Sequence, residues 1–212
     1  MPRLLAILGS RAPSNFSVDL LVAAFDFSSL TPPPIKDLSG PWFRVHQTSY
    51  APVYFGRSAT NRWDSPDGSY GVLYLGESWR AAFMESALHD PTAKVVVEAD
   101  LATRSMALMS STVDLRVVDV ADGITLRALG ISATNTQGPY SESQAISKAI
   151  YSAGWNVRGI RYRSKLDNGL ICLALFDFPA THLPLHDLGN LVSGFNRNLV
   201  AAMLRAYNIA LI

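Results

Sequence analysis

The stretch "NRWDSPDGSYGVLYLGESWRAAFMES" (residues 61–86) predicts two regular elements that follow one another directly. After the turn residues "SPDGS", the short run "GVLYLG" at 71–76 has the β-rich composition of a strand. From about residue 79, apolar side chains recur at helical spacing, and Ser78 can cap the N-terminus of a helix. We therefore expect a strand that leads straight into a helix.

The rest of the chain contains more expected strands than expected helices. Strand-like runs are "WFRVHQ" (42–47), "KVVVEADL" (94–101), "GIRYRS" (159–164) and "GLICLALFDF" (169–178), the last two joined by the turn "KLDNG". A helix is expected at 141–154, where Ser141 and Gln144 form a capping box and Gly154 stops the helix, and another at 195–207. Because strands and helices do not alternate regularly as βαβ units, we predict an α+β fold.

The first forty residues differ in composition from the remainder. "SVDLLVAAFDF" (17–27) suits a short helix packed on the main body, and "SLTPPPIKDLSGP" (29–41) contains four prolines. We expect the proline-rich stretch to lack regular structure and to act as a tether. The predicted organisation is thus an N-terminal element with its tether at 1–40 and a main domain at 41–212.

Composition excludes several classes of protein. The 212 residues are 49% hydrophobic and 17% charged, which suits one globular core, and the net charge of +1 with scattered Lys and Arg gives no footprint for direct nucleic-acid binding. Cys172 is the single cysteine, so no disulfide can form within the chain, and a reducing compartment is expected. The apolar run near the N-terminus is too short for a secretory signal, and no segment is long enough to cross a bilayer. We expect a cytoplasmic protein without membrane contact.

Three side chains of the opening stretch, and Arg44 before it, could take part in chemistry, but each also has an ordinary structural interpretation. On the expected helix, Glu85 has small apolar neighbours and His89 rather than the usual lysine or arginine, so it either faces a pocket or lies at the helix edge. Tyr74 alone fits a core tyrosine with a satisfied hydroxyl. Arg62 alone fits a loop arginine on an aromatic ring, and Arg44 an outward-facing strand residue.

Taken together, these residues fit an anionic ligand that has a flat aromatic part. An arginine fork matches phosphate, a tyrosine offers a ring face, and a carboxylate can hold a ribose hydroxyl and stabilise nearby positive charge. NAD attacked at its nicotinamide–ribose bond has these properties. Cleavage passes through an oxocarbenium-like state and nicotinamide leaves as a neutral group, so a second carboxylate to protonate the leaving group is unnecessary.

The motifs "FRVH", "NRWDSP" and "GVLYLGESWRAAFMES", followed later by "GIRYRS", resemble the RES domain in order and spacing over roughly residues 42–180. The resemblance implies an ADP-ribosyltransferase-like α+β fold with a mixed β-sheet core and flanking helices, and makes 41–212 the catalytic domain. It also implies a toxin of a bacterial toxin–antitoxin pair. Such a toxin would cleave the nicotinamide–ribose bond of NAD, pass ADP-ribose to water or phosphate, and deplete cellular NAD.

Carried over to this sequence, the resemblance assigns a role to each matching residue. Arg44 and Arg62 are implied to contact the NAD phosphates, and Tyr74 to pack on the nicotinamide end. Glu85 is the implied catalytic carboxylate. Ser164, in "RYRS", is implied to hydrogen-bond the nicotinamide ribose or its amide.

The sequence departs from the family pattern at three positions. Asn61 stands where a glycine is usual and Asp64 where an asparagine is usual. Asp64 is expected to add negative charge close to the phosphate site. Lys165 replaces a common arginine, which keeps the charge but loses the bidentate geometry.

Two other functions remain open at this stage. The chain could transfer ADP-ribose to a specific protein, or it could bind a nucleotide or a partner without catalysis. The resemblance also implies a protein partner, an Xre-like helix-turn-helix antitoxin that covers the active site. No cofactor is expected beyond NAD as substrate, and no metal, because the histidines at 46, 89, 182 and 186 lack a metal-ligand spacing.

Overall fold

The computed structural model describes residues 24–88, 92, 94–179 and 182–212, and within them the fold is built on one large mixed sheet. The sheet has the strand order β1-β6-β7-β8-β3-β2-β5-β9, in which β6 and β7 are parallel and the other neighbours antiparallel. Its strands are β1 (Ile35–Leu38), β2 (Trp42–Gln47), β3 (Val72–Gly76), β5 (Arg104–Met109), β6 (Leu115–Asp119), β7 (Gly159–Arg163), β8 (Ile171–Phe176) and β9 (Leu185–Asn190). A small parallel pair joins β4 (Val95–Val96) to β10 (Ala210–Leu211). The predicted α+β class is confirmed.

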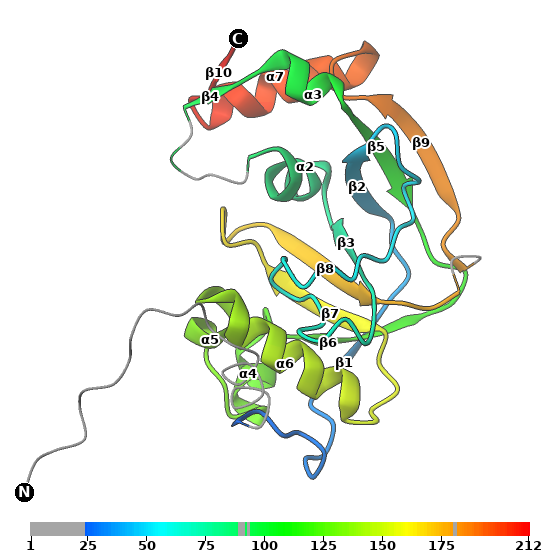
Figure 1. The fold of residues 1–212 in the computed structure, drawn as a ribbon, viewed down its shortest axis with the longest axis vertical. Coiled ribbons are helices and arrows are strands. Elements are labelled where there is room, and N and C mark those ends of the chain that lie inside the picture. The colour runs from blue at the N-terminus through cyan, green and yellow to red at the C-terminus, as the bar shows by residue number, and fades with distance from the viewer. Residues whose placement is uncertain (1–23, 89–91, 93, 180–181) are drawn as a thin grey trace, which may run out of the picture.

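Helices flank the sheet, which curls around one of them (Figure 1). They are α2 (Trp79–Ala87), α3 (Glu98–Ala102), α4 (Gly123–Ala128), α5 (Ala133–Gln137), α6 (Tyr140–Ser152) and α7 (Gly194–Ala206). Helix α2 lies inside the curl, α3 and α7 lie near the β5–β9 end, and α4 to α6 lie by β6 and β7. Among the described residues, no helix combines the length and apolar character needed to cross a membrane.

The predicted strand-to-helix unit is present as β3 and α2. Ser78 is the N-cap of α2, and its hydroxyl accepts a hydrogen bond from the backbone N–H of Ala81 at 3.1 Å. Gly76 ends the strand where the helix comes closest, and a Cβ at this position would lie 2.4 Å from the backbone nitrogen of Ala82. The predicted strands at 42–47, 159–164 and 169–178 and the closing helix are also confirmed, as β2, β7, β8 and α7.

The expected strand at 94–101 is wrong for most of its length. Only Val95 and Val96 are extended, and α3 begins at Glu98. The acidic residues in its first turn, Glu98 and Asp100, stabilise the helix because they lie near the positive end of its dipole. The β-branched run was therefore a weaker signal than the acidic residues after it.

The capping box expected for the helix at 141–154 is also wrong. Helix α6 begins at Tyr140 with Pro139 as its N-cap, so Ser141 already lies within the helix. The Gln144 side chain donates instead to the backbone oxygens of Ala59 and Asn61, at 3.0 and 2.9 Å. Its amide therefore supports a distant loop rather than its own helix. The helix does end just before Gly154, as predicted.

The proline-rich stretch at 29–41 is not wholly irregular, which corrects the expectation for it. Residues 35–38 form β1, an edge strand paired with β6, and the prolines fall outside this strand. Strand β1 thus precedes the predicted boundary at residue 40 and belongs to the same sheet as the later strands. The helix expected at 17–27 lies mostly outside the described residues. Phe27 is in the core, where its ring stacks on Trp155 at 6.0 Å.

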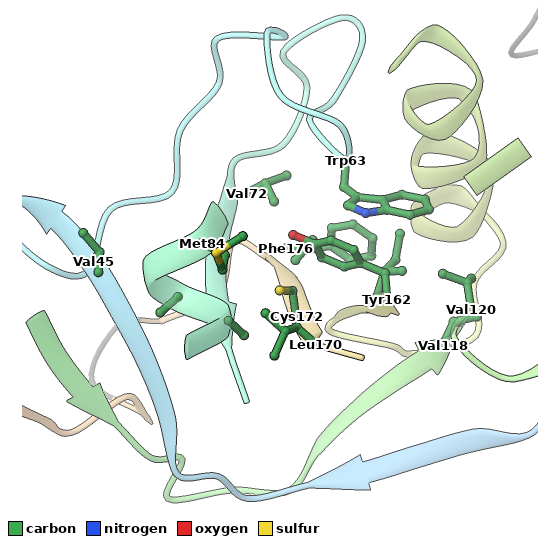
Figure 2. Packing of buried hydrophobic residues seen from close by; sticks show 14 of the residues in the cluster. Val45, Trp63, Val72, Met84, Val118, Val120, Tyr162, Leu170, Cys172 and Phe176 are labelled. Atoms are coloured by element: carbon green, nitrogen blue, oxygen red, sulfur yellow. The ribbon is translucent and has the colours of Figure 1, made fainter. Parts of the chain in front are cut away.

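Two apolar clusters cover the two faces of the sheet. In the larger one, the Trp63 ring lies 5.5 Å from the Tyr162 ring, and Cys172 lies close to the tyrosine on the next strand (Figure 2). Met84 brings α2 into the same cluster. The loop before β3, helix α2 and strand β7 therefore share one core, and this core fixes their relative positions.

Candidate functional site

A pocket of about 430 Å³ opens beside α2 and contains most of the predicted site residues. It is lined by Arg44, Val45, Asn61, Arg62, Tyr74, Glu85, Ser86, Arg104, Tyr140, Tyr162, Lys165 and Leu166. These residues come from β2, the loop before β3, β3, α2, β5, α6, β7 and the turn after β7. The fold thus gathers the predicted Arg44, Arg62, Tyr74 and Glu85 around one cavity.

Glu85 is half-buried in the pocket wall, so of its two interpretations the pocket-facing one agrees with the structure. Its carboxylate oxygen Oε1 accepts a hydrogen bond of 2.5 Å from the Ser164 hydroxyl. The two residues are 79 positions apart in the chain. A hydrogen bond to a charged acceptor is about twice as strong as one between neutral groups, so Ser164 restrains the direction of the carboxylate.

Ser164 itself lies behind the glutamate. Its side chain is 0% exposed, and its oxygen accepts from the backbone N–H groups of Leu166 and Asp167 at 3.1 and 3.4 Å. The hydroxyl therefore connects the turn after β7 to Glu85. Its implied contact with the nicotinamide ribose or amide stays a prediction.

Arg62 is held tightly although it lies in a loop. The residue is 6% exposed, and its Nη1 donates to the backbone oxygen of Thr136 at 2.9 Å. Its guanidinium also lies 5.5 Å from the centre of the Tyr140 ring. One nitrogen of the guanidinium is therefore hydrogen-bonded within the protein, while the residue still lines the cavity.

Tyr74 has its hydroxyl satisfied, as expected of a core tyrosine, and it also lines the pocket. The phenol donates to the carboxylate of Asp64 at 2.8 Å and accepts from the backbone N–H of Trp63 at 3.0 Å. Burial, with the negative charge of Asp64, raises the pKa of Tyr74 well above its ordinary value. Tyr74 is therefore a neutral phenol at every physiological pH.

Asp64 does not line the pocket, although it was expected to add charge near the phosphate site. It is 1% exposed, and its oxygens accept hydrogen bonds from the surrounding loop and from Tyr74. Its charge is therefore used to organise the loop.

Arg104 and Tyr140 are among the lining residues that the sequence did not predict. Arg104 begins β5 opposite Gln47, and only the pairing of β5 with β2 brings it to the cavity. Tyr140 begins α6, and its ring faces two cations, with the Lys165 ammonium at 5.9 Å from the ring centre. The position of Tyr140, directly after a proline at the start of a helix, was a weak indication of a site residue. No sequence pattern indicated Arg104.

The pocket lining is strongly cationic. In the described structure it includes the arginines at 44, 62 and 104 and Lys165, against the carboxylate of Glu85. Arg44, which its strand pattern alone places outward, lines the cavity, and its side chain donates to the backbone oxygen of Tyr54 at 3.4 Å. Burial lowers its pKa to about 10, so it stays charged at neutral pH. Such a lining suits a polyanionic ligand.

A metal centre is not formed by the described part of the chain, where no group of three or more His, Cys, Asp or Glu side chains gathers.

Comparison with known proteins gives two matches. The model of the RES domain matches residues 41–190. The fold is similar to that of a chain in the crystal structure of the M. tuberculosis MbcT–MbcA toxin–antitoxin complex, with a TM-score of 0.59 and 18% sequence identity, over 90% of this chain and 96% of that chain. No curated protein matches the sequence.

Proposed function

Because the chain belongs to the RES domain family, we propose that it is the toxin of a toxin–antitoxin pair and acts by cleaving the nicotinamide–ribose bond of NAD. One observation carries this proposal. Glu85 stands in a cationic pocket with its carboxylate held by the buried Ser164 hydroxyl. A fixed carboxylate among phosphate-binding cations is what the reaction needs.

Binding would be governed by the cations of the lining. The diphosphate of NAD carries two negative charges, and the free edges of Arg62 and Arg44 can each donate to a phosphate oxygen. Arg104 and Lys165 add charge at other parts of the wall. Tyr74 and Tyr140 offer ring faces to the flat parts of the ligand.

Bond cleavage would then rely on Glu85. As the C–N bond breaks, its electron pair goes to the nicotinamide ring, which loses its positive charge and leaves as a neutral molecule. The ribose becomes positively charged at its anomeric carbon, and a carboxylate fixed beside it stabilises that charge. Water or inorganic phosphate then attacks this carbon and loses a proton, which gives ADP-ribose or its 1″-phosphate.

A protein antitoxin would be the natural partner of such an enzyme. The likeness to a chain from a toxin–antitoxin complex supports this. We propose that an Xre-like helix-turn-helix antitoxin covers the pocket in the inactive complex. Adding the antitoxin to the purified chain should then stop nicotinamide release.

The direct test is to incubate the purified protein with NAD, with and without phosphate, and to follow nicotinamide and the ADP-ribose product by chromatography. Glu85→Gln should lower the rate by at least about 100-fold, because the transition-state charge loses its stabiliser. Glu98→Gln is the matched control, since Glu98 is also a half-buried helical glutamate, but it pairs with Arg197 and does not line the pocket. Both variants should melt close to the wild-type temperature.

Different results would point to different functions. Full activity in Glu85→Gln would remove this residue from the mechanism. Labelled NAD in a cell lysate would leave radioactivity on one protein band if the acceptor is a protein. A melting shift with NAD but no nicotinamide release would support a binding role.

A further inference from the structure

The loop at 58–64, which carries Arg62, is organised around the buried carboxylate of Asp64. Oδ2 accepts from the Ser58 hydroxyl at 3.0 Å and from the backbone N–H groups of Thr60 and Asn61 at 3.1 and 3.0 Å. It also accepts from the Asn61 side-chain amide at 3.1 Å. An ionised carboxylate is suited to this role because it accepts hydrogen bonds along several directions and donates none.

The backbone is fixed on both sides of Arg62, by Asp64 on one side and by Tyr74 and Ser147 on the other. Asn61, which precedes it, is tied to Asp64 by its main chain and its side chain. Trp63, which follows it, donates its N–H to the Tyr74 oxygen, and its carbonyl accepts from the Ser147 hydroxyl at 2.8 Å. With its neighbours held, the Arg62 side chain leaves the loop in one direction.

The same carboxylate also decides which way the Tyr74 hydroxyl points. Oδ1 of Asp64 lies 2.8 Å from the phenol oxygen, and since a carboxylate cannot donate, the phenol must. The phenol oxygen already accepts the Trp63 N–H. The Tyr74 hydroxyl hydrogen is therefore bonded to Asp64 and is not available to a ligand.

We propose that Asp64 is a positioning residue of the pocket, which sets the place of Arg62 and the hydrogen-bond direction of Tyr74. This inference rests on the proposed NAD cleavage for its catalytic consequences. The arrangement of the loop can be tested without it. Asp64 would contact no substrate and would act through the two residues that do.

Two substitutions separate the two roles. Asp64→Ala removes the acceptor, so the amides of Thr60 and Asn61 should lose protection in hydrogen–deuterium exchange. The Michaelis constant for NAD should then rise by about tenfold or more, because Arg62 is no longer held. Asp64→Asn can keep its carbonyl oxygen at the Oδ2 position and place its NH₂ group toward Tyr74. This variant should restore amide protection and a Michaelis constant within about threefold of wild type, but lower kcat by about tenfold through the reversed phenol.

Asp119→Ala provides a matched control for loss of a buried acid. Asp119 is 8% exposed and pairs with Arg161 at 2.8 Å, outside the pocket lining. Its removal should lower the melting temperature and leave exchange at 58–64 and the Michaelis constant unchanged. A merely structural role for Asp64 would leave the Michaelis constant of Asp64→Ala unchanged, as in this control, even if exchange at 58–64 increased.

Each outcome decides one part of the inference. Retained amide protection, or an unchanged Michaelis constant, in Asp64→Ala overturns the positioning of Arg62. Wild-type kcat in Asp64→Asn overturns the part concerning Tyr74. If the wild-type protein releases no nicotinamide, the proposed function fails, and the exchange data alone then decide: lost protection in Asp64→Ala supports the Asp64-centred loop and retained protection refutes it.

Discussion

Replacing Ser164 with alanine should slow NAD cleavage without preventing folding. In the structure its hydroxyl donates to Glu85 at 2.5 Å and accepts from the backbone N–H of Leu166 at 3.1 Å. A hydrogen bond to a charged group contributes about 1.5–3 kcal/mol. If that bond holds the carboxylate where the transition-state charge develops, its loss lowers kcat by roughly 10- to 150-fold at about 1.4 kcal/mol per factor of ten. The Michaelis constant should change little, since the cations proposed to bind the diphosphate stay in place.

Stability and catalysis can be separated with Ser65→Ala. Ser65 is also fully buried, and its hydroxyl donates to Asp67 at 2.6 Å and accepts from the N–H of Ser69 at 3.0 Å. Both alanine variants should lose about 1–3 kcal/mol of unfolding free energy, because each removes a buried hydroxyl that donates to a carboxylate and accepts from a backbone N–H. Only Ser164→Ala should lose kcat, measured as initial nicotinamide release at saturating NAD. A wild-type kcat in folded Ser164→Ala would refute the reasoning.

Two further predictions concern the frame of the site and its response to pH. Gly76→Ala should displace α2 and with it Glu85, because the new Cβ would lie 2.4 Å from the helix backbone. We expect about 1–3 kcal/mol of destabilisation and reduced nicotinamide release. Gly123→Ala, where the new Cβ meets no atom within 4 Å, should retain wild-type melting and activity. Burial raises the pKa of Asp67, but hydrogen bonds from two serines and from Lys148 outweigh it and hold the pKa well below the ordinary value. Because the pKa of Asp67 is lower in the folded state, this residue stabilises the protein above about pH 4, and its contribution to stability is lost as the pH falls. Urea unfolding should therefore show a smaller loss of stability between pH 6 and pH 3 in Asp67→Asn than in wild type. Equal losses would contradict this.

Local sequence was sufficient to predict the strand-to-helix unit that carries Tyr74 and Glu85. The period of the apolar residues and the N-cap at Ser78 act over a few positions, so they survive in almost any tertiary context. The same kind of pattern failed at 94–101, where a run of valines gave way to a helix that begins at Glu98. A short β-branched run has no strong preference of its own, because strand formation depends on what pairs with it.

The sequence by itself therefore determined the fold class, the family motifs and the identity of the carboxylate, the aromatic ring and the first arginines of the site. Tertiary structure decided how they are arranged. It brought Ser164 to Glu85 across 79 positions, took Arg104 into the pocket through strand pairing, and turned Asp64 into the centre of the Arg62 loop. Hydrogen bonds between distant residues leave no periodic trace in a sequence, since their partners are neighbours only in the folded chain, where the sheet curls around α2.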